Sequence, residues 1–168
     1  MGKALIRLAN ESDLDALCDL YFEFHEFHAC HVPAYLRSLG NPSKQAREEL
    51  RQKILEIIQA EHSTIFVADF SGQTIGLAEI YLRQPDPTNL ALVPTPYAHL
   101  QSLVVTEPLR RQGVGEQLLQ AAQVWAQENG AAELRLDIWE FEELSAGPLG
   151  FYEKMEYHTI RRTLAKKL

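Results

Sequence analysis

The chain has 168 residues, of which 46% are hydrophobic and 23% are charged, and its formal net charge is −7. This composition is ordinary for one soluble globular domain with a core of its own, and we expect a single domain over residues 1–168. The negative charge argues against nucleic acid as a partner, because phosphate binding requires a basic face, and it would suit a cationic substrate such as an amine.

The first part of the chain predicts a strand followed by a helix. Ala4–Ala9 favours a strand, and Ser12 is an N-cap candidate for a helix with an apolar stripe. That stripe consists of Leu14, Leu17, Cys18, Tyr21 and Phe24. The helix continues into a stretch rich in His and Phe, but His25 and His28 have no third ligand at an established spacing. We expect a pocket wall there rather than a metal site, and no metal cofactor.

The remaining elements follow from the hydrophobic periodicity and from the turn residues between the periodic segments. Predicted in chain order are a helix at about Lys44–Ala60, strands Thr64–Phe70 and Thr74–Leu82 joined by a hairpin at 71–73, a loop at 84–97, a strand Ala98–Val105, a helix Gly115–Asn129, a strand Glu133–Trp139, a short helix with Pro148 in its first turn, and a terminal segment Tyr157–Leu168. We expect the terminal segment to close an edge of the sheet, and such an edge would allow a homodimer.

Cys18 and Cys30 are too few for a disulfide framework, and they form no Cys-x-x-Cys pair. The amino-terminal segment carries charge early and contains no long apolar run. We therefore expect neither a signal peptide nor a membrane span, and we expect the protein in the cytoplasm.

Glu79 is an unusual residue in the strand Thr74–Leu82, because it shares a face with Ile75, Leu77 and Tyr81. Burial of this carboxylate would raise its pKa, which is what a general base near neutral pH requires. The alternative is that the strand leaves the core at this point and that Glu79 meets solvent. The sequence leaves both alternatives open.

The segment Leu103–Leu119 predicts a strand, a glycine loop and a helix. Gly113 and Gly115 lack a Cβ, so the backbone there can take positive φ and a ligand can approach its N–H groups closely. Those groups lie at the positive end of the helix macrodipole, beside Arg110 and Arg111. The loop therefore favours a pyrophosphate, although it matches neither the Gly-x-x-x-x-Gly-Lys-Ser/Thr nor the full Gly-x-Gly-x-x-Gly pattern.

A second motif, Phe-Tyr-Glu-Lys at 151–154, lies some 36 residues after Gly115. Together with Arg110-x-x-Gly113-x-Gly115, it resembles the GNAT superfamily of acyl-CoA-dependent N-acyltransferases, and the resemblance covers nearly the whole chain. The run Trp-Glu-Phe at 139–141 is also similar to bacterial small-molecule members. The resemblance implies an α+β fold in three layers, with a mixed, mostly antiparallel sheet of six or seven strands, helices on both faces, and the element order β-α-α-β-β-β-α-β-α-β.

The resemblance further implies acetyl-CoA as the acyl donor. The implied coenzyme-binding residues are Leu103, Val104 and Val105 on the strand beside the pantetheine arm, and Arg110, Arg111, Gln112, Gly113, Val114 and Gly115 around the pyrophosphate. Tyr152 matches the general acid for the leaving thiolate, and its alternative role is that of a core tyrosine.

The chain departs from the family pattern at two positions near its carboxyl end. Ser145, or Glu142 when counted forward from Trp139, stands where the family commonly has an Asn near the coenzyme. Glu156 replaces the glycine that usually ends the last helix, so we expect this turn to be made differently.

The general base is not fixed by the resemblance, because Gln101 and Ser102 stand where members often carry acidic residues. The candidates are Glu79 on the neighbouring strand, a water-relayed path, and His99, which by strand alternation shares a face with Gln101 and Leu103.

These features together predict direct transfer of an acetyl group from acetyl-CoA to a primary amine of a small molecule or peptide, without a covalent enzyme intermediate. The alternative is a non-catalytic acyl-CoA-binding regulatory module, because the acidic residue expected at Gln101 is missing. A nucleotide-binding protein that uses the same loop is a third interpretation.

Overall fold

A computed structural model of the chain describes residues 4–31, 43–84, 88, 95–139 and 148–163. Its elements are β1 (Leu5–Leu8), the 3₁₀ helix η1 (Glu11–Asp13), α1 (Leu14–His31), α2 (Lys44–Gln59), β2 (Ser63–Phe70), β3 (Gln73–Arg83), β4 (Tyr97–Val105), the 3₁₀ helix η3 (Glu107–Leu109), α3 (Val114–Glu128), β5 (Glu133–Leu136) and α4 (Pro148–Lys154). The predicted order of helices and strands is confirmed as far as α4. The chain divides into two compact units, Met1–Asp137 and Ile138–Leu168.

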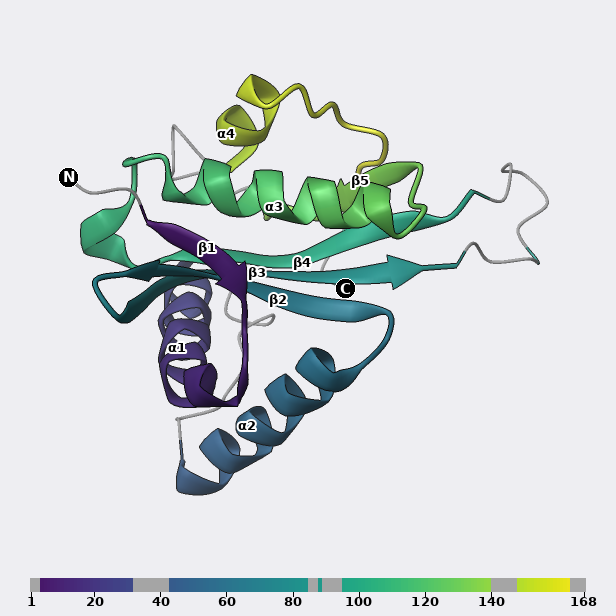
Figure 1. Ribbon diagram of the computed structural model, residues 1–168. Helices are drawn as coiled ribbons and strands as arrows, with labels where there is room; N and C mark the ends of the chain where they lie inside the picture. Colours follow the sequence, from purple (N-terminus) through teal and green to yellow (C-terminus); the bar gives the residue numbers. More distant parts are fainter. Residues whose placement is uncertain (1–3, 32–42, 85–87, 89–94, 140–147, 164–168) are drawn as a thin grey trace, which may run out of the picture. The chain divides into compact units, whose positions relative to one another are not determined.

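The first unit is built on a five-stranded sheet with the strand order β1-β2-β3-β4-β5. Neighbouring strands are antiparallel, except that β4 and β5 run parallel. The helices α1 and α2 cover one face of this sheet, and α3 covers the other (Figure 1). Because both faces are covered, the central strand β3 is buried without interruption from Ile75 to Ile80.

The prediction of six or seven strands is wrong for the described residues, which form five. The strand predicted at Glu133–Trp139 ends at Leu136, where its pairing with β4 also ends. The strand predicted from Tyr157 onward is absent over 157–163, where Ile160 is exposed. β-Favouring residues form a strand only where they find a paired neighbour and a surface to pack on, so the edge expected for a homodimer is not present in these residues.

The core on the α1 and α2 side is made of apolar side chains from both helices and the three central strands. Its members are Ala9, Leu14, Leu17, Cys18, Leu20, Tyr21, Ile54, Ile65, Val67, Leu77 and Val104. On the other face, α3 buries one stripe with Leu118, Leu119, Ala122 and Ala126. Gly76 allows this close packing, since a Cβ there would lie 2.7 Å from the Val104 carbonyl oxygen and 3.1 Å from Leu118 Cδ1.

The hairpin between β2 and β3 is confirmed where the sequence predicts it. Phe70 pairs with Gln73, so the turn consists of Ser71 and Gly72. Both turn residues have positive φ, at 54° and 82°. This is the pattern of a type I′ turn, whose twist matches that of the two strands it joins.

The entry to α1 differs from the prediction, because Ser12 is not an N-cap and Asn10 is the N-cap of η1, the 3₁₀ helix that leads into α1. Asn10 Oδ1 accepts a hydrogen bond from the Ser12 N–H at 2.9 Å, and the Asp13 carboxylate accepts one from the Asn10 N–H at 2.9 Å. The two residues therefore form a reciprocal capping box ahead of the helix. Ser12 is exposed and donates its own hydroxyl to Asn10 Oδ1.

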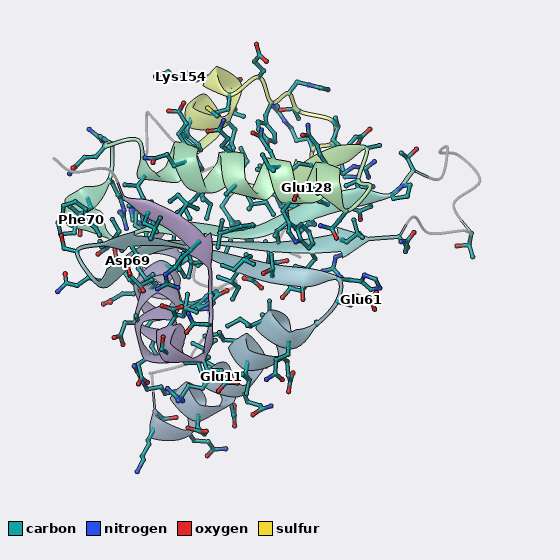
Figure 2. All side chains as sticks on the ribbon, viewed as in Figure 1. Glu11, Glu61, Asp69, Phe70, Glu128 and Lys154 are labelled. Atoms are coloured by element: carbon teal, nitrogen blue, oxygen red, sulfur yellow. The ribbon has the colours of Figure 1, made fainter. Side chains whose placement is uncertain are left out.

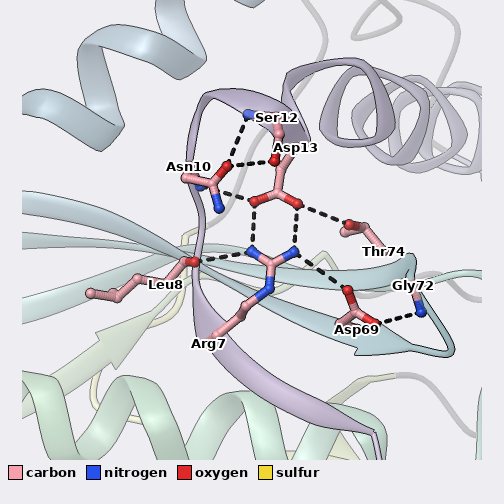
Figure 3. A network of polar contacts seen from close by, with 8 residues as sticks. All are labelled: Arg7, Leu8, Asn10, Ser12, Asp13, Asp69, Gly72 and Thr74. Atoms are coloured by element: carbon pink, nitrogen blue, oxygen red, sulfur yellow. Dashed lines mark hydrogen bonds and ion pairs between the residues drawn. The ribbon is translucent and has the colours of Figure 1, made fainter.

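A network of polar contacts fixes this helix entry to the sheet (Figure 3). Arg7 on β1 binds both carboxylate oxygens of Asp13, at 2.7 and 2.8 Å, and contacts Asp69 of β2 at 3.4 Å. Thr74 of β3 donates its hydroxyl to the same Asp13 carboxylate. The Arg7 guanidinium holds the pKa of the buried Asp13 below its usual value, and the network joins three strands to the start of α1.

Acidic side chains lie at several separate places on the surface of the first unit. Glu11, Glu61 and Glu128 are exposed and belong to η1, to the turn after α2 and to the end of α3 (Figure 2). No described helix is long and apolar enough to cross a membrane. The described residues also contain no group of three or more His, Cys, Asp or Glu side chains that could hold a metal ion.

The second unit contains α4, which begins at Pro148 as predicted. The turn after α4 is made with Glu156 in the left-handed conformation, at φ 66°, and the Tyr157 N–H donates to the Tyr152 carbonyl. The expectation that this turn must be made differently is therefore wrong. Glutamate takes the conformation that glycine takes more easily.

Candidate active site

The Glu79 side chain lies in the middle of the sheet, on the face covered by α1 and α2. It is opposite Ile65 of β2 and Ser102 of β4, and residues paired in this way share a face. Only 5% of Glu79 is exposed to solvent. Of the two alternatives left open by the sequence, the structure shows the buried one.

Three hydroxyl groups donate hydrogen bonds to the Glu79 carboxylate. Tyr21 of α1 and Ser102 Oγ bind Oε2 at 2.7 and 2.9 Å, and Tyr81 binds Oε1 at 2.6 Å. Burial, followed by the charge of Glu79 and the bonds to it, raises the pKa of both tyrosines, so their hydroxyl protons stay in place. Three donors match the ionised carboxylate, which only accepts hydrogen bonds.

The sequence predicted this constellation only in part. It placed Tyr81 on the face of Glu79, because the two residues are two positions apart on one strand. From the sequence, Tyr21 is one more position of the apolar helix stripe, and Ser102 only stands where members of the family often carry an acidic residue. No local pattern could have found these two partners, because they come from elements 58 and 23 positions away from Glu79.

A β-bulge in β4 changes which side chains share a face with Glu79. Glu79 pairs with Ser102, but Ile80 pairs with Leu100, so Gln101 is an extra residue on β4. His99 is therefore opposite Tyr81, on the Glu79 face, whereas Leu103 is opposite Ala78 on the other face. The prediction that His99 shares a face with Leu103 is wrong, because simple alternation ignores the added residue.

His99 is a second basic group beside Tyr81. Burial lowers the pKa of its imidazole, although the Asp137 carboxylate acts in the opposite direction. The His99 Nε2 lies 3.9 Å from Asp137 Oδ2, which is too long for a hydrogen bond. The imidazole is thus held mainly neutral and able to accept a proton.

The second half of β4 has an open edge next to this face. Pairing with β5 ends at Leu100 and Leu136, and within the described residues no strand pairs with that side of β4 beyond this point. The Thr106 N–H donates to Ile75 of β3, so by alternation the backbone groups of Leu103 and Val105 point away from β3. They face the open edge, where an extended ligand could pair with them.

The glycine loop follows this edge and leads into α3. Gly113 is the N-cap of α3 with φ 80°, and Arg111 also has positive φ at 62°. A Cβ on Gly113 would meet no atom within 4 Å, so glycine is needed there for its backbone conformation and not for space. Gly115 lies inside the first turn of α3 and has no positive φ, which differs from the expectation for both glycines.

The start of α3 has the properties of an anion site. The first N–H groups of an α-helix have no acceptor within the helix, and the Gly113 cap offers no side chain to bind them. They point out of the positive end of the helix dipole. The backbone of Val114 and Gly115 is thus suited to a phosphate group, as the sequence predicts.

The side chains around the loop have contacts of their own. Arg110 donates from Nε to the Val105 carbonyl at 2.9 Å and from Nη2 to Glu23 at 3.0 Å. Gln112 donates to the Pro108 carbonyl at 3.4 Å, and Arg111 is exposed. The roles of these three residues in coenzyme binding stay predictions, as do those of Leu103, Val104 and Val105. Ser145 lies outside the described residues.

Tyr152 belongs to the second unit, on α4. Its ring packs against Phe151, with the centroids 5.0 Å apart, and against Tyr157, with the centroids 5.7 Å apart. The Tyr152 carbonyl accepts the hydrogen bonds that end the helix. Its role as the general acid stays a prediction.

Comparison with known proteins gives consistent matches. The family described as the acetyltransferase (GNAT) family matches residues 14–157. An aminoglycoside N(6')-acetyltransferase type 1 from Serratia marcescens is 33% identical over 122 residues, which cover 70% of this chain and 82% of that protein. Among solved structures, a mutant of the BH1408 protein from Bacillus halodurans has a TM-score of 0.83 at 20% identity, covering 98% and 99% of the two chains. Aminoglycoside N-acetyltransferase AAC(6')-Iy in complex with CoA has a TM-score of 0.73 at 22% identity, covering 100% and 97%.

Proposed function

We propose that this chain, which belongs to the acetyltransferase (GNAT) family and transfers the acetyl group of acetyl-CoA to a small-molecule amine, acts on a primary amine of an aminoglycoside. The observation that carries the proposal is the position of the buried Glu79 carboxylate against Ser102, the residue directly before Leu103 on the open edge of β4. The similarity to an aminoglycoside N(6')-acetyltransferase supports the acceptor class. The net charge of −7 suits a polycationic acceptor.

The donor lies along the open edge of β4 in this proposal. The pantetheine arm pairs with the backbone groups of Leu103 and with the Val105 N–H, because Arg110 already binds the Val105 carbonyl. The pyrophosphate binds the N–H groups at the start of α3. This arrangement places the thioester carbonyl near the bulge at Gln101, one residue from Ser102. A backbone N–H of the bulged strand stabilises the oxyanion that forms on the carbonyl.

The acceptor must lose a proton before it can react. An alkyl ammonium has a pKa near 10, so only about one molecule in a thousand is the free amine at pH 7. In our proposal Glu79 receives this proton through one water molecule, and the hydrogen bonds from the Tyr21, Tyr81 and Ser102 hydroxyls fix the position of the carboxylate. His99 is the alternative base.

The transfer itself is direct. The free amine nitrogen attacks the thioester carbonyl carbon, and the nitrogen of the adduct loses its second proton to water, which returns a proton to the Tyr152 oxygen once Tyr152 has protonated the thiolate. The carbon–sulfur bond breaks, and the coenzyme thiolate leaves. Tyr152 donates the proton that the thiolate takes up. The products are an N-acetylated amine and free coenzyme A, and no covalent enzyme intermediate forms.

The proposal is tested by measuring release of the coenzyme thiol with acetyl-CoA and a panel of acceptors. The panel contains aminoglycosides with and without a 6'-amine, a polyamine and a peptide amino terminus. We expect turnover that requires the 6'-amine. Turnover confined to the polyamine or the peptide would overturn the acceptor assignment. A melting-temperature shift with acetyl-CoA but no turnover on any amine would favour the non-catalytic module.

Two controls accompany this assay. Melting temperatures are measured with acetyl-CoA, ATP and NAD, because a ligand at 100 times its dissociation constant adds about 2.7 kcal/mol to the folded state. A shift with ATP or NAD alone would favour the nucleotide-binding interpretation. The variant Tyr152→Phe should lose turnover while it keeps the shift with acetyl-CoA. Full turnover in the Tyr152→Phe variant would contradict the assignment of Tyr152 as the general acid.

A further inference from the structure

Glu23 lies in the second half of α1, yet its carboxylate binds the segment that connects β4 to the glycine loop. It accepts hydrogen bonds from the Thr106 hydroxyl at 3.0 Å, from the Glu107 N–H at 2.9 Å, and from Arg110 Nη2 at 3.0 Å. These partners are between 83 and 87 positions away in the sequence. One carboxylate thus connects α1 with the whole entry to the loop.

This connection supplies a cap that the segment lacks. The short helix η3 begins at Glu107, and its N-cap residue Thr106 makes no capping hydrogen bond with its own side chain. The Thr106 hydroxyl is directed to Glu23 instead, and the Glu107 N–H is bound by the same carboxylate. Since a free N–H at a helix start needs an acceptor, Glu23 replaces the local cap with a tertiary one.

Arg110 completes the connection from the side of the sheet. Its guanidinium joins the Val105 carbonyl, at the end of β4, to Glu23. It also lies over the Phe27 ring of α1, 5.5 Å from the ring centroid. The described contacts of the guanidinium are all with the scaffold, on the side of α1 and β4.

We propose that Glu23 and Arg110 form a latch, which fixes the entry of the glycine loop against α1 and so holds the loop in its coenzyme-binding conformation. Two residues of the loop, Arg111 and Gly113, have positive φ, and such a backbone is retained only where its ends are fixed. Glu23 and Arg110 are positioning residues in this proposal, and the proposal rests on the assignment of the loop to acetyl-CoA.

The latch also relates the two substrates to one helix. Tyr21 of α1 binds the Glu79 carboxylate, and Glu23, two positions later, binds the loop entry. A shift of α1 would therefore move both the proposed base and the coenzyme loop. Through the latch, α1 therefore sets the position of the coenzyme loop relative to Glu79, the proposed base for the amine.

The test compares Glu23→Ala, Glu23→Gln, Arg110→Ala and the double variant Glu23→Ala/Arg110→Ala with the natural chain. For each we measure the Kd of acetyl-CoA by calorimetry, KM and kcat for both substrates, and the melting temperature. Glu26→Gln is the matched control, because Glu26 is an exposed glutamate three positions further along the same helix. All binding is measured well below the lowest melting temperature, so that every variant is folded.

We expect Glu23→Ala to raise the Kd and KM of acetyl-CoA roughly tenfold, the effect of losing hydrogen bonds to a charged group. Its kcat and its KM for the amine should stay within about twofold, which a general loss of folded protein would not produce. The Kd of acetyl-CoA in Glu23→Gln should lie between those of the natural chain and of Glu23→Ala, because the glutamine amide oxygen still accepts from the Glu107 N–H. In the double variant, Arg110→Ala should raise the Kd of acetyl-CoA little beyond its value in Glu23→Ala, since the two residues act as one unit.

Two results would overturn the latch alone. One is an unchanged Kd in Glu23→Ala while the natural chain binds acetyl-CoA. The other is a double variant whose effect equals the product of the single effects, because Arg110 would then contact the coenzyme independently of Glu23. If the natural chain does not bind acetyl-CoA at all, the proposed function and the latch both fail.

Discussion

Replacement of Glu79 by glutamine tests the centre of the proposed mechanism. The change removes the negative charge and keeps the size of the side chain. The glutamine oxygen can still accept from Tyr21 and Ser102, which share Oε2 in the natural chain, while its NH₂ group replaces Oε1 against Tyr81. The Tyr81 hydroxyl can then turn and accept. Because charged hydrogen bonds become neutral ones without any being left unmade, we expect a loss of only about 1–2 kcal/mol in the free energy of unfolding.

The loss of activity should be much larger than this loss of stability suggests. General base catalysis contributes about 10²- to 10⁴-fold, so kcat at pH 7 should fall by that factor in Glu79→Gln. The variant depends on amine that is already deprotonated, and the free amine increases about tenfold per pH unit below its pKa near 10. Its rate should therefore rise about tenfold per unit between pH 7 and 9, more steeply than that of the natural chain.

The assay follows release of the coenzyme thiol at saturating acetyl-CoA, from pH 6 to 9. Glu61→Gln is the control, because Glu61 is exposed in the turn after α2 and is not one of the residues that bind the Glu79 carboxylate. Tyr81→Phe removes one donor and leaves the carboxylate, so it should reduce kcat by less than Glu79→Gln does. A Glu79→Gln variant that keeps half of the natural rate at pH 7 would refute the assignment of Glu79. His99→Gln would then be tested as the base in the same assay.

Three further predictions concern the scaffold. Gly76→Ala should lower the free energy of unfolding by about 1–3 kcal/mol in urea denaturation, because its Cβ would lie 2.7 Å from a backbone oxygen, and an unchanged midpoint would contradict the packing of α3 on β3. Gly113→Ala and Gly72→Ala should each cost about 1–2 kcal/mol, because both glycines have φ near 80° and open space around the Cβ position. Only Gly113→Ala should also weaken acetyl-CoA binding, and equal Kd values for the two variants would argue against the loop as the coenzyme site. The folded-state pKa of Asp13 is lowered, so its contribution is fully present above the unfolded value of about 3.9 and is lost as the pH falls through the folded pKa. The stability of Asp13→Asn should accordingly depend less on pH below about 4 than that of the natural chain, and parallel acid denaturation curves would contradict this reasoning.

The course of the chain was largely readable from the sequence, because it depends on local periodicity and turn chemistry. The hairpin at Ser71 and Gly72 lies where a short glycine-containing turn was predicted. The helix caps were less readable. Ser43 is the N-cap of α2 where the sequence predicted the helix to open, but at the entry to α1 the capping residue is Asn10, which caps η1, and not Ser12. Several polar residues precede α1, and the choice among them is made by Asp13, which Arg7 fixes from β1.

The last part of the chain was predicted less well, because strands need partners that sequence does not display. The alternation of Glu133–Trp139 continues beyond the point where β5 pairs with β4, and the residues after Tyr157 have β-favouring side chains but no strand over 157–163. Glu156 adopts a left-handed backbone that its residue type disfavours, and the hydrogen bonds from 156 and 157 back to α4 retain it.

The sequence by itself determined the element order through α4, the glycine loop before α3 and the family, because glycines, strand periodicity and a second motif at fixed spacing are all local signals. The tertiary structure alone decided that Glu79 is buried under three hydroxyl groups, that the bulge at Gln101 brings His99 to the Glu79 face, and that Glu23 holds the entry to the loop. Each of these depends on the pairing or packing of elements distant in sequence. One added residue in a strand moves the side chains of all later residues of that strand to the opposite face. The Glu79 carboxylate receives hydrogen bonds from Tyr21 and Ser102 only after α1 has packed on the sheet and β3 has paired with β4.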